Sequence, residues 1–195
     1  MTAAPPAAED RPDLRLHEGD VEKGRAAEMN DAQLRDAMRR RGITDPGLTL
    51  RVARAVGLPL PYACTVLELE TSGGRNVFGR DPGYHGPYKG LPVTHDRYLA
   101  YRRHAAETGE HNGVGYTQLT SEALQVRADE LGGCWRPEPN VRVGFGFLRD
   151  LIREAGSAEA GFTRYNGSLA YGRRAIERAA VWERALDTDG SNRVA

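Results

Sequence analysis

Two glutamates stand close together where an apolar stretch of the sequence gives way to glycines. Glu68 and Glu70 fall within "VLELETSGGRN", residues 66–76. On a helix that begins at Pro61, residues three, four and seven positions apart share a face, so Glu70 joins the apolar side and Glu68 points more toward solvent. Burial favours the neutral form of a carboxyl group and should raise the pKa of Glu70. A carboxylic acid that keeps its proton near neutral pH can act as a general acid.

The alternative is a structural carboxylate at a helix end that pairs with Arg75 or Arg80. Three other stretches favour the chemical interpretation because of their order: "SGGRN" (72–76), "GVGYTQLT" (113–120) and "RYNGS" (164–168). Paired glycines let the backbone approach a bulky ligand, and amide side chains can hydrogen-bond both backbone and sugar. Each stretch also has a structural interpretation, in which glycines mark turns, Gln118 is on the surface and Tyr165 is in the core.

Taken together, these stretches resemble the three motifs of the lysozyme-like superfamily. The resemblance covers about residues 58–187 and is closest to soluble lytic transglycosylases and goose-type lysozymes, in particular the lysin domains of phages that infect actinobacteria. Glu70 matches the catalytic Glu, and Thr71 stands where Ser is usual. In the second motif Tyr-Thr replaces Leu-Met, and Arg164 replaces the usual Ala of the third. The resemblance implies these substrate-binding residues beside Glu70: Thr71, Asn76, Gly115, Tyr116, Gln118, Tyr165 and Asn166.

The activity implied by the resemblance is cleavage of the β-1,4 bond between N-acetylmuramic acid and N-acetylglucosamine in peptidoglycan. In a lytic transglycosylase one Glu acts as acid and then as base and leaves a 1,6-anhydro end, with Tyr165 orienting Glu70 or the acetamido group. A muramidase-type hydrolase needs a second carboxylate, for which Asp81 is a better candidate than Asp96. A different class is a virion or tail-associated structural module that binds the wall without cleaving it.

Composition narrows the class of partner. The chain has 195 residues with 27 basic and 27 acidic side chains, so no basic field predicts a nucleic-acid partner. No apolar run approaches the roughly 20 residues of a membrane span. The N-terminal "MTAAPPAAEDRPDLRL" lacks the pattern of a secretory signal. Together with the resemblance, the absence of a signal predicts synthesis in a host cytoplasm and phage-dependent delivery to the cell wall. The expected partner is the glycan strand of peptidoglycan, and the protein is expected to be a monomer or one module of a larger lysis system.

No cofactor or metal is expected, because the histidines are scattered and no Cys/His cluster has metal-ligand spacing. The two cysteines, Cys64 and Cys134, are either separate core residues or one bridge.

The expected fold is mostly α, a lysozyme-like α+β fold with minimal β structure and the catalytic Glu at the end of a core helix. Residues 1–28 are rich in Ala, Pro and charge and predict a disordered arm, and residues 188–195 predict a flexible tail. Residues 29–57 form a helical extension and residues 58–187 the catalytic domain. Capping residues and glycines predict helices at about 30–41, 45–57, 61–71, 95–107, 122–131, 141–155, 158–164 and 173–186, with a possible short strand pair at 114–119.

Overall fold

The computed structural model describes residues 29–187. The predicted disordered arm and flexible tail, residues 1–28 and 188–195, lie outside the described residues. Within residues 29–187 the fold is mostly α, as expected. Its eight helices are α1 (Asp31–Arg40), α2 (Pro46–Val56), α3 (Leu60–Thr71), α4 (His95–Thr108), α5 (Glu122–Glu130), α6 (Pro137–Ala155), α7 (Ala158–Asn166) and α8 (Leu169–Asp187).

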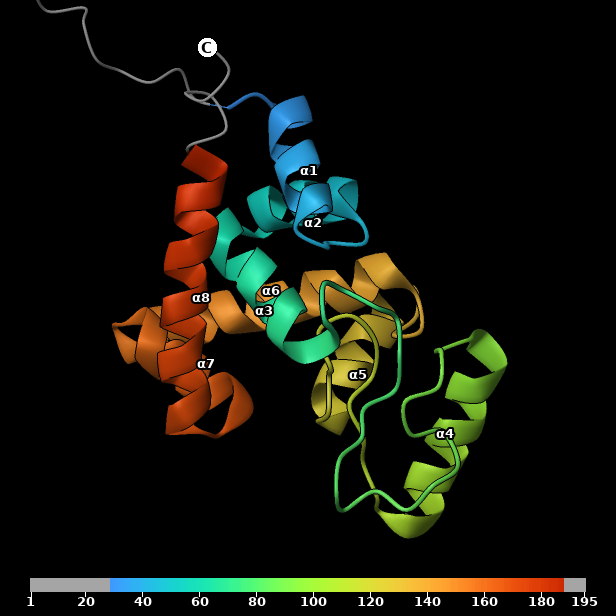
Figure 1. The fold of residues 1–195 in the computed structure, drawn as a ribbon. Coiled ribbons are helices and arrows are strands. Elements are labelled where there is room, and N and C mark those ends of the chain that lie inside the picture. Colours follow the sequence, from blue (N-terminus) through green and yellow to red (C-terminus); the bar gives the residue numbers. More distant parts are fainter. Residues whose placement is uncertain (1–28, 188–195) are drawn as a thin grey trace, which may run out of the picture.

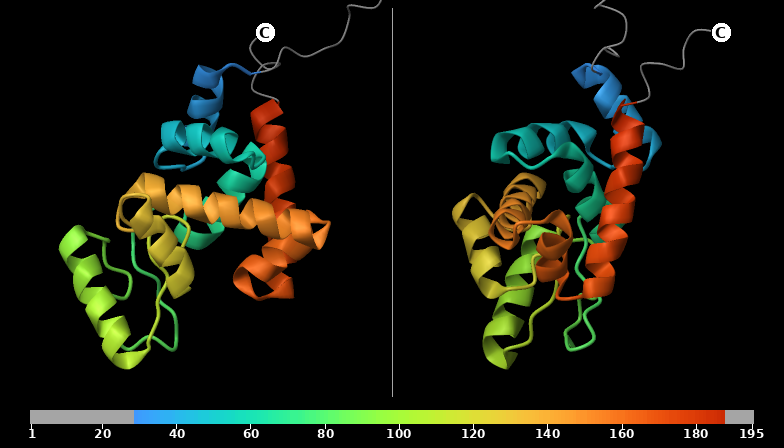
Figure 2. Two further views of the ribbon diagram at one scale, coloured as in Figure 1. Left: turned by 180° about the vertical axis from the view of Figure 1, so that it is seen from behind. Right: turned by 90° about the vertical axis from the view of Figure 1, so that its left-hand side faces the viewer.

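Helix α6 crosses the middle of the molecule, and the other elements are arranged around it (Figure 1). Helices α1 and α2 lie on one side of α6, while α8 runs along one edge and folds back over α7. Helices α4 and α5 and the long loop that joins α3 to α4 lie on the side of the molecule away from α1 and α2, as the turned views also show (Figure 2).

The buried side chains form two hydrophobic clusters. The first, here the helical lobe, combines side chains from α1, α2, α3, α6, α7 and α8. The second, here the loop lobe, combines Phe78, Tyr84 and Val93 of the long loop with residues of α4 and α5. Helix α6 serves both, because Phe145 packs in the helical lobe and Val143 in the loop lobe. The predicted helical extension, α1 and α2, therefore packs into the same core as α3 and α8.

Local signals set most helix ends. Asn30 and Gln33 form the predicted reciprocal capping box of α1, with Gln33 Oε1 accepting the Asn30 N–H at 2.9 Å. Helix α6 begins at Pro137, not after Asn140, because proline suits a first turn and the Asn140 side chain is used elsewhere. Helix α8 begins at Leu169, four residues before the predicted start, because the carbonyl and hydroxyl of Ser168 bond the first-turn N–H groups.

Extended structure is confined to two isolated bridges in the described residues. Val77 pairs with Pro92, and Phe78 pairs with Val114. Val114 and Leu119 also exchange backbone hydrogen bonds of 3.2 and 3.1 Å around a turn. The predicted strand pair is therefore a turn whose first residue bridges to the long loop.

The two cysteines are separate and buried. Cys64 lies in the helical lobe and Cys134 in the loop lobe, and neither forms a disulfide. Of the two alternatives left by the sequence, the structure has separate core residues.

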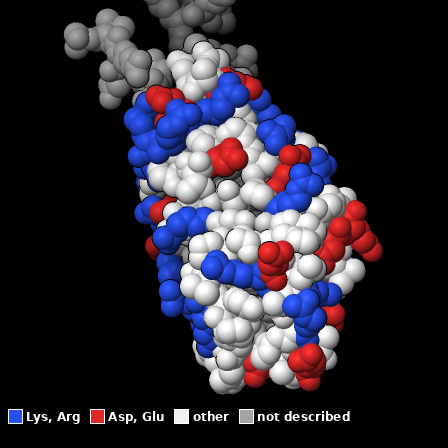
Figure 3. Space-filling model, turned by 90° about the vertical axis from the view of Figure 1, so that its right-hand side faces the viewer, with Lys and Arg blue, Asp and Glu red and all other residues white. Residues whose placement is uncertain are grey.

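Basic and acidic side chains are interspersed over the face shown in Figure 3. No helix among the described residues is long and apolar enough to cross a membrane.

Two glycines of α6 form a matched test of packing. A Cβ atom on Gly144 would lie 2.2 Å from the Thr117 hydroxyl oxygen, whereas a Cβ atom on Gly146 would meet nothing within 4 Å. Overpacking costs about 1–3 kcal/mol, and replacing glycine by alanine within a helix recovers up to about 1 kcal/mol. We expect Gly144→Ala to lower the free energy of unfolding and Gly146→Ala to raise it, measured by urea denaturation. Equal effects of the two substitutions would contradict the close approach at Gly144.

Candidate active site

The turn at residues 114–118 is the centre of the candidate site. Four consecutive backbone carbonyls in it each accept a side-chain hydrogen bond. The donors and distances are Asn140 Nδ2 to Val114 at 2.8 Å, Gln118 Nε2 to Gly115 at 2.7 Å, Thr71 Oγ to Tyr116 at 2.8 Å and Tyr165 Oη to Thr117 at 2.7 Å. These donors come from α6, the turn itself, α3 and α7. All three sequence motifs therefore meet at this turn.

The buried amide of Asn140, on α6, also bonds a second residue of the turn. Its Oδ1 accepts the backbone N–H and the hydroxyl of Thr117 at 3.1 and 3.0 Å. Thr117 is fully buried and packs on Gly144 of α6. Gly115 has a φ of +76°, and a side chain there would collide with Asn140. The glycine of the second motif is thus required by the fold itself.

Helix α3 delivers Glu70 to this turn. The helix ends at Thr71 and is capped by Ser72, which has a left-handed φ of +55°, and Gly73 follows with a φ of +105°. A Cβ atom on Gly73 would lie 2.0 Å from the carbonyl oxygen of Gly42, so this glycine allows the chain to pass the α1–α2 connection. We expected the paired glycines to admit a ligand, but Gly73 approaches another part of the same chain.

The carboxyl group of Glu70 is half-buried between the lobes and accepts a 2.5 Å hydrogen bond from the hydroxyl of Tyr171. It forms no salt bridge within residues 29–187, so the alternative pairing with Arg75 or Arg80 is absent. Burial raises the pKa of Glu70 to about 7. The Tyr171 hydrogen bond and the charge of Arg174 oppose this rise, while the charge of Asp81 adds to it.

The hydroxyl that bonds Glu70 belongs to Tyr171 and not to Tyr165, which was expected to orient either Glu70 or the acetamido group. Tyr165 instead donates to the Thr117 carbonyl, and its own pKa is raised first by burial and then by the negative charge of Glu70. Tyr171 was missed because the predicted helix began too late to include it. A helix that begins after Ser168 would have placed Tyr171 on the same face as the buried residues Ala175, Ala179 and Trp182.

Two hollows flank Glu70, and both include it in their walls. The first, here the α7–α8 hollow, has a volume of about 250 Å³ and is lined by Leu69, Glu70, Asn166, Ser168, Ala170, Tyr171 and Arg174. The second, here the loop hollow, has a volume of about 300 Å³ and is lined by Glu70, Thr71, Ser72, Arg75, Val77, Phe78, Gly79, Arg80, Gly90 and Gln118. The acid therefore stands where the two hollows adjoin.

Gln118 lines the loop hollow and Asn166 lines the α7–α8 hollow, so each of them shares one hollow with Glu70. Gln118 has a φ of +49°, and its Nε2 also donates to the Val77 carbonyl at 2.9 Å. Tyr116 is half-buried at the helical lobe, with its ring against Gly74.

Asn76 and Asp81 face the protein backbone. Asn76 Nδ2 donates to the carbonyl of Trp135 at 2.9 Å, and Asp81 Oδ2 accepts the N–H of Gly113 at 2.8 Å. Neither residue lines the α7–α8 hollow or the loop hollow. In these positions they hold the loop lobe together.

Glu68 was expected to point toward solvent, and the structure corrects this. Its carboxylate is half-buried, accepts the indole N–H of Trp182 at 2.9 Å and pairs with Arg178. Helix α8 covers this side of α3, so the second glutamate joins two helices. Sequence spacing on one helix carries no information about such a neighbour.

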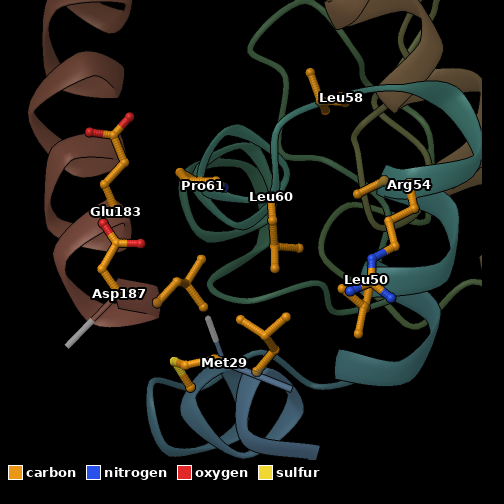
Figure 4. A pocket seen from close by; sticks show the side chains of 11 residues that line it. Met29, Leu50, Arg54, Leu58, Leu60, Pro61, Glu183 and Asp187 are labelled. Atoms are coloured by element: carbon orange, nitrogen blue, oxygen red, sulfur yellow. The ribbon is translucent and has the colours of Figure 1, made fainter. Parts of the chain in front are cut away.

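The largest hollow among those described lies elsewhere. It has a volume of about 620 Å³ and lies between α1, α2, α3 and α8, with Met29, Leu50 and Leu60 around it and Glu183 and Asp187 on the α8 side (Figure 4). Its lining is mainly aliphatic and includes none of the predicted site residues. The size of a hollow therefore does not identify the candidate active site. The position of Glu70 in the walls of the two smaller hollows does identify it.

No group of three or more His, Cys, Asp or Glu side chains within residues 29–187 is arranged to hold a metal ion. No protein-family model, curated protein or solved structure matches the chain.

The arrangement supports proton transfer by one carboxyl group. With a pKa of about 7, Glu70 holds its proton about half of the time at neutral pH and can both donate and accept. The hydroxyl of Tyr171 bonds one carboxyl oxygen and leaves the other to a ligand. A molecule that spans the two hollows would place its middle at this group.

Replacing Tyr171 by Phe tests the contact with Glu70. The hydroxyl stabilises the carboxylate, so we expect Tyr171→Phe to move the pKa of Glu70 upward from about 7. The measurement is a pH titration of the Glu70 carboxyl carbon by NMR. Tyr165→Phe is the control, because that hydroxyl bonds the Thr117 carbonyl and should move the Glu70 titration less. A downward shift in Tyr171→Phe would exclude the assigned donor.

Burial of Glu70 should also appear in protein stability. Its pKa is about 7 in the folded protein against 4.5 as the ordinary value, so ionisation favours the unfolded chain as the pH rises from about 4.5 to 7. We expect Glu70→Gln to match the wild type in free energy of unfolding at pH 4 and to exceed it by roughly 1–3 kcal/mol at pH 8. Glu68→Gln should lower stability at pH 8, because it weakens the pair with Arg178. A Glu70→Gln variant no more stable than wild type at pH 8 would place the carboxylate in water.

Proposed function

We propose that this protein cleaves the β-1,4 bond between N-acetylmuramic acid and N-acetylglucosamine in peptidoglycan, within a lysozyme-like fold and as a lysin of phage type. The observation that carries the proposal is a carboxyl group with a pKa of about 7 at the junction of two hollows. A glycan chain is long and has repeated linkages, so sugars could occupy both hollows with a linkage over Glu70. The resemblance of the three motifs adds support, because the residues they name converge on one turn.

The route we favour is that of a lytic transglycosylase. Protonated Glu70 donates its proton to the bridging oxygen, the bond from that oxygen to C1 of the muramyl sugar breaks, and the glucosaminyl sugar leaves with a hydroxyl at C4. The Glu70 carboxylate then takes the proton of the muramyl C6 hydroxyl, whose oxygen bonds to C1 and closes a 1,6-anhydro ring. Glu70 regains its proton and no water is consumed. Only one carboxyl group is needed.

The position of Asp81 favours this route over hydrolysis. Its carboxylate is bonded to the Gly113 N–H and lines neither hollow beside Glu70. A hydrolase would require that group to form a bond with the sugar or to activate water. The influence of Asp81 on the pKa of Glu70 keeps hydrolysis as the second candidate, since its charge is felt at the acid.

Purified protein and cell walls test the proposal directly. We expect Glu70→Gln to reduce the release of muropeptides by about 10²–10⁴-fold while keeping the fold, because it removes the proton donor. Asp81→Asn is the matched variant, since an asparagine oxygen can still accept the Gly113 N–H, and it should retain activity. Mass analysis of the wild-type products should give 1,6-anhydromuramyl ends.

The outcomes separate the candidates. Reducing ends together with an inactive Asp81→Asn variant would replace the transglycosylase by a muramidase-type hydrolase. A folded wild type that binds walls and releases nothing would favour a wall-binding structural module. An active Glu70→Gln variant would reject the proposed acid.

A further inference from the structure

Two arginines of the loop hollow have no carboxylate partner among residues 29–187. Arg75 and Arg80 line this hollow together with Glu70, and both are exposed. None of the salt bridges formed among residues 29–187 involves either of them, although many other arginines of that region are paired. Two positive charges therefore face the same hollow with the raised-pKa acid as its only acidic lining residue.

Arg75 is held by the backbone at the end of α3. Its Nε donates to the carbonyl of Thr71 at 3.0 Å, one residue after Glu70. A guanidinium has five N–H donors, so this bond leaves those of the two terminal nitrogens for a ligand. The helix that presents the acid thus also positions this cation.

The guanidinium of Arg80 lies close to the backbone of Gly90. A Cβ atom at Gly90 would lie 2.4 Å from Nη2 of Arg80, 2.5 Å from its Cζ and 2.8 Å from its Nε. The absence of a side chain at Gly90 therefore gives the guanidinium its place. The Gly90 N–H bonds the carbonyls of Phe78 and Gly79, both at 3.1 Å, which fixes that backbone. The hydrogen bond of Arg75 to the Thr71 carbonyl restrains that side chain, and a restrained cation loses less entropy when it binds.

We propose that Arg75 and Arg80 form a subsite for a carboxylate carried by the substrate, beside the bond that Glu70 cleaves. This inference rests on the proposed function and deepens it, because it assigns recognition of an acid on the muramyl sugar or its peptide to two residues of the loop hollow. Guanidinium groups match the two oxygens of a carboxylate in geometry and charge. The carboxylate has two sources, the acids of the stem peptide in the intact wall and the lactyl acid once the peptide is removed.

Binding measured in the Glu70→Gln background tests the subsite without turnover. The ligands are muropeptide oligosaccharides, the same glycans after amidase treatment, and oligomers of N-acetylglucosamine, with dissociation constants from calorimetry. We expect the further changes Arg75→Gln and Arg80→Gln together to weaken binding about 10- to 100-fold for acid-bearing ligands, as for a lost hydrogen bond to a charged group. Binding of the neutral oligomers should change less than about twofold.

The ligand pattern identifies the source of the carboxylate. If the arginine variant loses affinity for the muropeptide alone, the subsite binds an acid of the stem peptide. If it loses affinity for the amidase-treated glycan, the subsite binds the lactyl acid. Arg127→Gln is the control, because this exposed arginine of α5 lines neither hollow. Thermal unfolding of each variant tests whether the protein stays folded.

Two results would overturn the proposed subsite. One is an unchanged affinity of the arginine variant for both acid-bearing ligands, and the other is an equal loss of affinity for the neutral oligomers. Failure of the proposed function is a separate result, namely a wild type that releases no muropeptides. An enzyme that cleaves walls while its arginine variants bind like the Glu70→Gln parent would reject only the subsite.

Discussion

The structure around the site depends on four backbone carbonyls in one turn. A carbonyl group that is buried without a donor costs free energy, and here residues 114–117 obtain donors from α3, α6, α7 and the turn itself. These hydrogen bonds bring α3, α6 and α7 together at the turn. The end of α3, and with it Glu70, is placed by this requirement through Thr71 and Tyr116.

Glu70 itself reflects a balance between burial and polar contact. The apolar side of α3 carries the carboxyl group out of water, which favours its neutral form, and the hydroxyl of Tyr171 partly offsets that effect. Two lobes are needed for this environment, since one contributes α3 and α8 and the other the long loop. A single helix could not desolvate the acid and also leave space on both sides of it.

Much of the helical fold could be predicted from local residues, because capping side chains, prolines and glycines act within a few positions. Asn30, Asp45 and Thr94 cap helices where they were expected to, and Glu70 was placed correctly on the apolar side of α3. Contacts between distant segments could not be predicted in this way. Glu68 with Trp182 spans 114 positions and Tyr171 with Glu70 spans 101. Helical periodicity states which face a residue occupies, but not which polar group covers that face.

The bonds that hold the turn have one property in common: amides and hydroxyls make all of them, and none carries a charge. Dissolved ions screen charges and leave such neutral contacts largely unaffected. A change in pH near neutrality therefore changes the protonation of Glu70 and leaves the hydrogen bonds of the turn unchanged. In the proposed mechanism, alkali would remove the proton of Glu70 and stop the reaction, and neutralisation would restore it without any refolding of the site.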